Sequence, residues 1–233
     1  MKKRISILLF LLSLIFVTAT AESFEFYQKI RNAAEQGNAK AQGLLGVMYE
    51  SGKGARQDDV EAVKWYRRGA EQGDIMAQLS LGRMYDRGQG IAQSYSEAIR
   101  WYRLAAEQGD AMGQSLLGVM YDYGQGVEQN FAEAVKWYRL AANQGSGPAQ
   151  LNLGVMYAAG KGVRQDYAEA LKWWRLAADQ DVAEAQSNLG RMYDNGIGVK
   201  QNKIMAKEWY GKACDNGSQK GCDNYRKLKE QGY

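Results

Sequence analysis

The sequence contains no histidine and only two cysteines, and each scarcity excludes a kind of site. Without histidine, neither a Ser-His-Asp nor a Cys-His nucleophilic system can be built in its usual form. The commonest metal ligand is missing as well. We therefore expect no enzyme activity, no bound metal and no cofactor.

The chain also carries little net charge once its first residues are set aside. The formal net charge is +4, and removal of Lys2, Lys3 and Arg4 lowers it to +1. Lysine and arginine are interspersed with aspartate and glutamate, as on a solvated surface. Because nucleic-acid binding depends on a cationic surface, we expect no nucleic-acid partner.

Residues 1–21 have the composition of a secretory signal peptide. Three cations are followed by an apolar run from Ile5 to Val17, and Ala19-Thr20-Ala21 supplies small residues for cleavage after Ala21. The apolar run is shorter than the roughly 20 residues that span a membrane. We expect cleavage, no membrane anchor in the mature chain, and a periplasmic or secreted location.

A 36-residue unit repeats five times, which predicts stacked supersecondary units. Its copies begin at Ala34, Ala70, Ala106, Ala142 and Ala178. We predict that Ser23 to Ala33 forms an N-terminal half-repeat and that the C-terminus closes with a polar helix. The expected segments are a signal peptide (1–21), a capping half-repeat (22–33), five repeats (34–69, 70–105, 106–141, 142–177 and 178–213) and a capping helix (214–233).

Each unit has the start and stop signals of two helices. In the third copy, Asp110 can cap a first helix and Gly124 can end it in a left-handed conformation. Asn130 can cap a second helix, with Glu133 at the spacing of a capping box. The box recurs as Asp58/Glu61, Ser94/Glu97 and Asp166/Glu169. The predicted fold is all-α, a right-handed α-solenoid of stacked αα-hairpins.

Small and aromatic residues recur at the positions where helices would pack. Alanine or glycine on the first helix and alanine on the second would let helices approach closely. The closing Trp-Tyr or Trp-Trp pairs, such as Trp65-Tyr66 and Trp173-Trp174, are expected to fill the space between adjacent hairpins.

The pattern A-x-Q-G-D-x-x-A-Q-x-x-L-G-x-M-Y-x-x-G-x-G-V-x-Q-D-x-x-E-A-x-K-W-Y-R-x-A resembles the Sel-one-like repeat, a relative of the tetratricopeptide repeat, over Ala34 to Ala213. The segment from Cys214 to Cys222 is similar to the secreted cysteine-rich subgroup of that family, which implies a disulfide from the end of one hairpin to the next helix. An isolated cysteine pair in an exported chain points to the same disulfide. A redox-active pair is the less favoured alternative, because the spacing is not C-x-x-C.

The resemblance implies an adaptor that holds a protein or peptide on the concave face lined by the first helices. We predict that specificity lies where first-helix residues differ between copies, although the apolar ones could instead pack between hairpins. The candidate binding residues are Met76, Leu79, Arg83, Arg87, Met112, Ser115, Leu116, Tyr123, Asn152 and Arg191.

The predicted function is an exported protein–protein interaction scaffold in envelope signalling or host contact, working as a monomer. Two alternatives remain open at this point. Some cysteine-rich family members have been assigned β-lactamase or penicillin-binding activity, although no serine here is followed three residues later by lysine. A peptidoglycan-binding module is the other alternative, suggested by location and the available aromatic residues.

Overall fold

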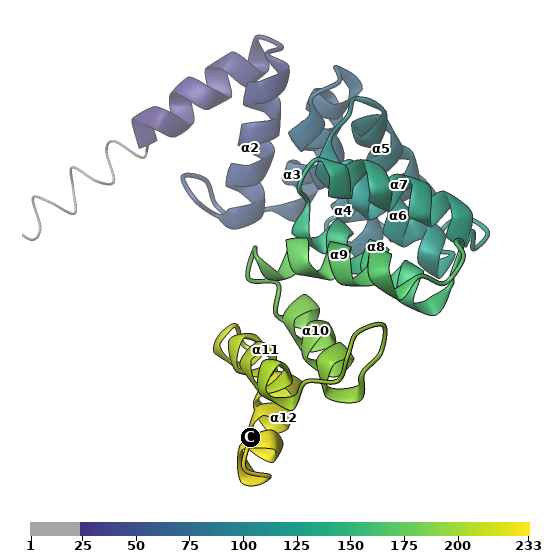
Figure 1. Ribbon diagram of the computed structural model, residues 1–233. Helices are drawn as coiled ribbons and strands as arrows, with labels where there is room; N and C mark the ends of the chain where they lie inside the picture. Colours follow the sequence, from purple (N-terminus) through teal and green to yellow (C-terminus); the bar gives the residue numbers. More distant parts are fainter. Residues whose placement is uncertain (1–23) are drawn as a thin grey trace, which may run out of the picture. The chain divides into compact units, whose positions relative to one another are not determined.

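The computed structural model describes residues 24–233, and within them all regular secondary structure is helical (Figure 1). The predicted signal peptide at residues 1–21 lies outside this part of the chain. A helix over residues 24–35 comes first. It is followed by α2 (Ala39–Ser51), α3 (Asp59–Glu71), α4 (Ile75–Arg87), α5 (Tyr95–Glu107), α6 (Ala111–Tyr123), α7 (Phe131–Asn143), α8 (Gly147–Ala159), α9 (Tyr167–Ala178), α10 (Ala183–Asn195), α11 (Lys203–Asp215) and α12 (Gln219–Glu230).

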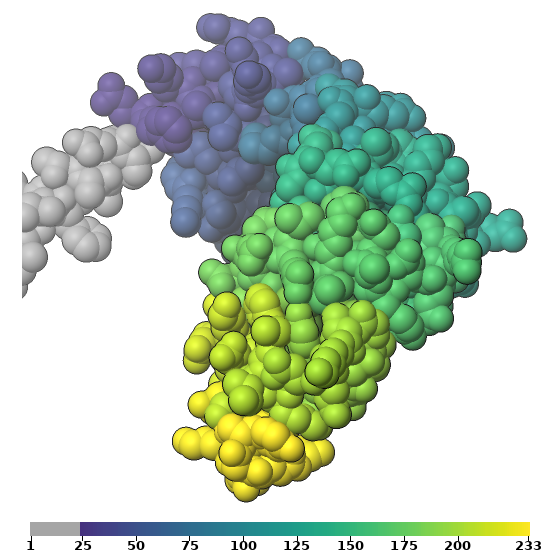
Figure 2. Space-filling view, viewed as in Figure 1, coloured from purple at the N-terminus to yellow at the C-terminus, as the bar shows by residue number. Residues whose placement is uncertain are grey.

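The chain forms two compact units, with unit 1 ending at Leu104 and unit 2 beginning at Ala105. In unit 1, α2 packs on α3, and α3 packs on α4. In unit 2 the hairpins are α6–α7, α8–α9 and α10–α11. The second helix of each hairpin packs on the helix that follows it, so that successive hairpins lie side by side (Figure 2). The prediction of an all-α solenoid of stacked αα-hairpins is confirmed.

The first helices begin and end as the sequence predicts. The Asp110 side chain accepts a hydrogen bond from the backbone N–H of Gly113 at 2.8 Å and so caps α6. Gly124 closes the same helix at φ 66°, and its N–H donates to the carbonyl of Met120. A residue with a Cβ would be strained in this left-handed conformation, which explains why glycine ends each first helix.

The predicted capping boxes on the second helices are only half formed. Asn130 Oδ1 accepts from the backbone N–H of Glu133 at 3.1 Å. The reciprocal bond is missing, because the N–H of Asn130 donates to the carbonyl of Tyr121 in the preceding helix. The Glu133 carboxylate instead lies 3.4 Å from Lys136, one helical turn on. These glutamates therefore stabilise the second helices by local ion pairs.

The glycine near the middle of each first helix makes room for an aromatic ring of the same hairpin. An ideal Cβ at Gly118 would lie 2.6 Å from the Tyr138 ring. The same contact joins Gly46 to Tyr66 and Gly154 to Trp174. Tyr138 also shares one core with Leu153 and Met156 of α8, the first helix of the next hairpin, and Trp173 packs into the same core from α9. The prediction that the aromatic pairs lie between adjacent hairpins is therefore confirmed.

Buried glutamines link each hairpin to the next. In unit 2, Gln150 Nε2 donates to the carbonyl of Ala142 at 3.1 Å, and its Oε1 accepts from Gln180 Nε2 at 2.8 Å. Gln114 and Gln144 make the equivalent pair, as do Gln42 and Gln72 in unit 1. Since an unpaired buried amide is costly, this ladder holds each first helix against the preceding second helix and against the second helix of its own hairpin.

The turn before α10 departs from the other copies at two adjacent positions. Val182 occupies the N-cap and offers no side-chain hydrogen bond, whereas Ser146 and Ser218 cap α8 and α12. Asp181 takes the place of a glycine and has φ 59°. Its Oδ1 accepts from Asn216 at 3.1 Å, which helps to hold this conformation.

We expect Val182→Ser to stabilise unit 2 by about 1 kcal/mol, because it supplies the missing cap. Ser146→Val should lower the stability by a similar amount. Urea denaturation monitored by circular dichroism would measure both changes. Loss of stability in Val182→Ser would show that the methyl groups of Val182 matter more than the cap.

Candidate functional site

The unit 1 candidates lie on α4 and differ in exposure. Met76 and Arg87 are exposed, while Leu79 is half-buried. On the neighbouring helix α2, Leu44 and Val47 are also exposed. These two residues were not among the candidates, although they occupy the same repeat positions as chosen residues. Unit 1 therefore presents an apolar first-helix surface that is wider than predicted.

Arg83 has a structural role that the sequence comparison missed. Its Nη2 lies 2.8 Å from both carboxylate oxygens of Glu50 on α2. Glu50 also accepts a hydrogen bond of 2.6 Å from Tyr66. The candidate binding residue Arg83 is therefore engaged within the protein, because it joins α4 to α2 in this network.

In unit 2, α6 carries the two most exposed large apolar candidates. Met112 is 62% exposed and Tyr123 is 70% exposed. Leu116 is half-buried on the same side of the helix, four residues after Met112. Ser115 is buried and offers little surface to a partner.

The following first helices of unit 2 add polar groups. Asn152 on α8 is half-buried, and Val155, one turn later, is exposed. Arg191 on α10 is exposed, and its nearest polar contact is Asn188 Oδ1 at 3.5 Å. We call Met112, Leu116, Tyr123, Asn152, Val155 and Arg191 the unit 2 first-helix surface. Its apolar, amide and guanidinium groups suit recognition of a protein or peptide, because such side chains anchor protein interfaces.

A partly buried carboxylate lies beside this surface. Asp122 Oδ2 accepts a hydrogen bond of 3.4 Å from the Tyr138 hydroxyl. Burial raises the pKa of Asp122, and the positive charge of Lys161 opposes that shift. Burial also raises the pKa of Tyr138, so the phenol keeps its proton and remains a donor to the carboxylate.

We expect Asp122→Asn to stabilise the chain at pH 7 by no more than about 1 kcal/mol, since solvent partly screens the site. The raised pKa means that the folded state binds the Asp122 proton more tightly than the unfolded state does. The charged carboxylate is therefore destabilising above its folded pKa, and this penalty disappears as pH falls through that value. Denaturation measured at pH 7 and near pH 3 should show that Asp122→Asn stabilises the chain less at the lower pH.

Asp194 is the matched control, because it occupies the same repeat position but lies 2.5 Å from Lys203 Nζ. Asp194→Asn removes this ion pair and should lower the stability at pH 7. A stabilising Asp194→Asn, or an Asp122→Asn gain that does not change with pH, would contradict the burial argument.

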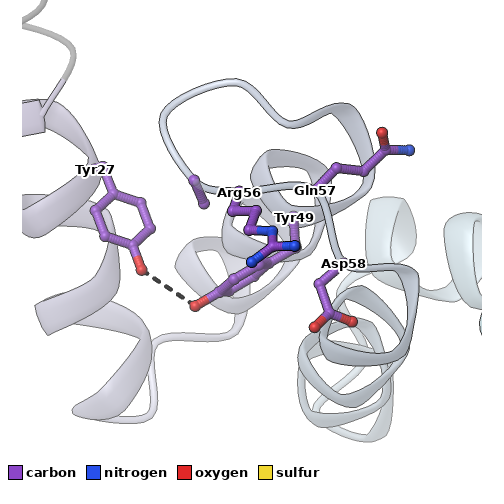
Figure 3. Close-up of a pocket in the computed structure, with 6 residues that line it drawn as sticks. Tyr27, Tyr49, Arg56, Gln57 and Asp58 are labelled. Carbon is purple, nitrogen blue, oxygen red and sulfur yellow. Dashed lines mark hydrogen bonds between the residues drawn. The ribbon is translucent and has the colours of Figure 1, made fainter.

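Two shallow crevices, one in each unit, are lined by residues from the same four repeat positions. In unit 1, Tyr27, Tyr49, Arg56, Gln57 and Asp58 line about 640 Å³, with the two phenols hydrogen-bonded at 3.1 Å (Figure 3). Burial and this bond raise the pKa of Tyr49 to about 12, the bond contributing most. The unit 2 crevice is lined by Tyr157, Arg164, Gln165, Asp166 and Tyr167. Because Asp58 and Asp166 both cap helices, these crevices follow from the repeat architecture.

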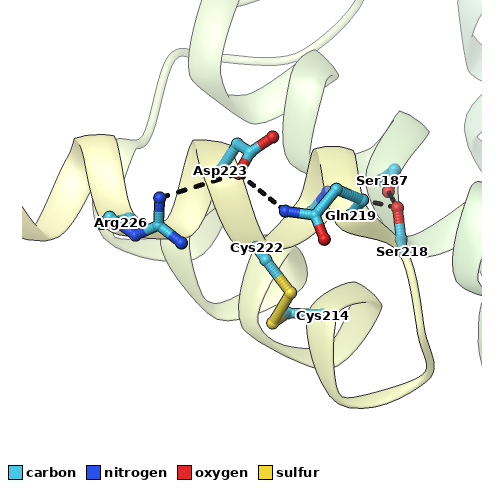
Figure 4. Close-up of a disulfide and its surroundings, with 8 residues drawn as sticks. Ser187, Cys214, Ser218, Gln219, Cys222, Asp223 and Arg226 are labelled. Atoms are coloured by element: carbon cyan, nitrogen blue, oxygen red, sulfur yellow. Dashed lines mark hydrogen bonds and ion pairs between the residues drawn. A yellow bond between two sulfur atoms is a disulfide. The ribbon is translucent and has the colours of Figure 1, made fainter.

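The predicted disulfide is confirmed at the C-terminal end of unit 2. Cys214 and Cys222 are bonded and join the end of α11 to α12, with their Cα atoms 4.5 Å apart (Figure 4). A hydrogen bond of 3.0 Å between Ser187 and Ser218 lies at the start of the same helix. A disulfide of this kind is typical of proteins in oxidising compartments.

Among residues 24–233, none of the helices combines the length and the apolar character needed to cross a membrane.

Two solved structures resemble the chain along most of its length. One is a protective antigen of uropathogenic Escherichia coli with an SLR fold, at 38% identity and TM-score 0.81, covering 89% of this chain and 44% of that one. This chain thus spans less than half of the antigen. The other is a Sel1 repeat protein from Oxalobacter formigenes, at 33% identity and TM-score 0.80, covering 88% and 82% of the two chains.

An immunity protein from Pseudomonas aeruginosa shares the fold at 21% identity and TM-score 0.53, covering 85% of this chain and 75% of that one. No curated protein matches the chain. The Sel1 repeat model matches five consecutive segments, 39–74, 75–110, 111–146, 147–182 and 183–218. Since these segments account for most of the chain, it belongs to the Sel1 repeat family.

Proposed function

We propose that this chain is a protein-interaction scaffold that binds a protein or peptide segment through its exposed first-helix residues. Sel1 repeat proteins generally act as interaction scaffolds. The observation that carries the proposal is the exposure of Met112 and Tyr123 on one helix. Large apolar side chains held in solvent by a rigid helix are typical of binding surfaces, because their burial by a partner supplies affinity.

The unit 2 first-helix surface also indicates what the partner segment presents. An apolar or aromatic side chain would cover Met112 and Leu116. A carboxylate or backbone carbonyl would accept from Asn152 or Arg191. Specificity then comes from the combination of these residues, because the side chain at each of these repeat positions varies among the five copies.

Site-specific crosslinking in the cell of origin would test the proposal. A photoreactive residue at position 123 should capture a partner that is identified by mass spectrometry and then produced as a purified protein. We expect Met112→Ala with Tyr123→Ala to weaken its binding at least about tenfold, a change of about 1.4 kcal/mol.

Ile204 provides the matched control, because it is as exposed as Met112 but lies on the second helix α11. Ile204→Ala should leave the affinity unchanged, and position 204 should not crosslink the same protein. Equal crosslinking from positions 123 and 204, or an unchanged affinity in the double variant, would exclude the first-helix surface as the site.

We further propose that the chain is exported, with its leader removed after Ala21, and that it acts in the periplasm or outside the cell in envelope signalling or host contact. The Cys214–Cys222 disulfide supports an oxidising compartment. The resemblance to a protein described as a protective antigen supports an accessible location. N-terminal sequencing of the chain from fractionated cells tests the export, and a retained Met1 would contradict it.

A further inference from the structure

The helix over residues 24–35 exposes apolar side chains at a position that is buried in every complete hairpin. It occupies the place of a second helix, one period before α3. Phe26 is 55% exposed, and the neighbouring Phe24 is 61% exposed. The equivalent residues in the five repeats, Ala62, Ala98, Ala134, Ala170 and Ala206, have no exposed surface.

The two sides of this helix have different surroundings. On one side, Tyr27 and Ala34 are buried in the core that α2 provides, and Tyr27 reaches the hydroxyl of Tyr49 (Figure 3). The side that carries Phe26 corresponds to the side of α3 that carries Ala62 and Tyr66, from which Tyr66 packs against Gly46 of its own first helix. Phe26 on this side is exposed, whereas its equivalent Ala62 is fully buried.

The other end of the array is closed to further helices. Helix α12 stands in the place of a first helix, and Arg226 occupies the position where Gly46 and Gly190 accept a Tyr ring. The Arg226 side chain is solvent-exposed and lies 3.8 Å from Asp223 (Figure 4). The Arg226 side chain occupies the space that a ring from another helix would need, which opposes head-to-tail growth of the array.

We infer that two copies of this chain pair through the helix over residues 24–35, in an antiparallel arrangement with two-fold symmetry. In such an arrangement Phe26 of each copy is covered by the same side of the other. The sequence alone favoured a monomer, because it gives no measure of how exposed these residues are.

The charges along this side suit pairing with an identical helix. Glu25 and Lys29 lie one turn apart in a single row, and neither forms an ion pair within residues 24–233. In an antiparallel two-fold pair, Glu25 of each copy faces Lys29 of the other, so two equivalent ion pairs form across the interface. Because two short helices bury less than a standard interface, we expect a reversible dimer with a micromolar dissociation constant.

Sedimentation velocity of the exported chain, which begins at Glu22, between about 1 and 200 µM tests the pairing. The wild-type chain should shift from monomer to dimer as its concentration rises. Phe26→Ala, which installs the residue found in the five repeats, should weaken dimerisation at least about tenfold. Ile204→Ala is the control and should leave it unchanged, and circular dichroism would establish that both variants are folded.

A charge exchange provides the second readout. Glu25→Lys and Lys29→Glu should each weaken the dimer, while the double variant E25K/K29E should restore it. A role in folding alone would not produce this recovery. A monomeric wild-type chain at the highest concentration, dimerisation unaffected by Phe26→Ala, or a double variant no better than the single ones would each overturn the proposal.

Discussion

Gln150→Leu should destabilise unit 2 by about 2–3 kcal/mol, although leucine has nearly the same size. Gln150 is almost fully buried and bonds both the end of the preceding second helix and Gln180 just after α9, the second helix of its own hairpin. Leucine removes both bonds, and the Gln180 amide keeps only the carbonyl of Leu176 as its acceptor. The Ala142 carbonyl still accepts a hydrogen bond from the N–H of Gly145, which limits the loss of stability. Urea denaturation would measure the change in free energy.

Hydrogen exchange would show where the loss falls. Because a repeat array is stabilised by nearest-neighbour contacts, protection should fall mainly in α8 and in the adjacent α7 and α9. The control is Gln180→Ala, which removes only the Gln180 bond of Gln150, from an exposed residue, and should cost about 0.5–1 kcal/mol. If Gln150→Leu cost no more than Gln180→Ala, the ladder would not hold the first helix against its neighbours.

The helices could be predicted from the sequence because their signals are local. Caps such as Asp110 and stops such as Gly124 depend on residues within one turn, and both are found as expected. The glutamine ladder could not be predicted this way, since Gln150 and Gln180 are 30 residues apart and nothing local distinguishes a buried glutamine from a surface one. Their recurrence at a fixed spacing was the available signal.

Comparison of the copies also indicates how the second residue of each Trp-Tyr or Trp-Trp pair packs. Tyrosine at this position accompanies an acidic residue 16 positions earlier, as with Tyr66 and Glu50 or Tyr138 and Asp122. In the fourth copy both change together, to Trp174 and Ala158, and the indole donates to the carbonyl of Leu151 at 3.1 Å. This paired change indicates that the two positions touch within one hairpin.

The candidate surface was harder to predict, because difference between copies does not separate a binding residue from a structural one. Arg83 replaces the valine of other copies, yet it bonds Glu50 across two helices. Arg191 makes the same replacement and stays exposed, because its neighbour in the preceding first helix is Ala158, which has no carboxylate. Whether each arginine is bonded or free for a partner therefore depends on its neighbour on another helix, which only the three-dimensional structure shows.

Removal of the disulfide should loosen the C-terminal end of unit 2 and leave unit 1 unaffected. Cys214 and Cys222 are eight positions apart, and a loop of this size contributes about 2–3 kcal/mol in the chain-entropy model. The helix that it holds, α12, packs on α11 and α10 alone among the described helices and buries only Gly221 and Leu228. With so little core, α12 depends on the covalent link more than any internal helix would.

The double variant Cys214→Ser with Cys222→Ser should therefore lose hydrogen-exchange protection in α12 first, while α2 and α3 keep theirs. Dithiothreitol should lower the melting temperature of the wild-type chain and leave that of the variant unchanged, because the variant has no disulfide to reduce. Equal loss of protection in both units would mean that the disulfide supports the whole array. Undiminished protection of α12 would mean that Leu228 and the Ser187–Ser218 hydrogen bond hold the helix without it.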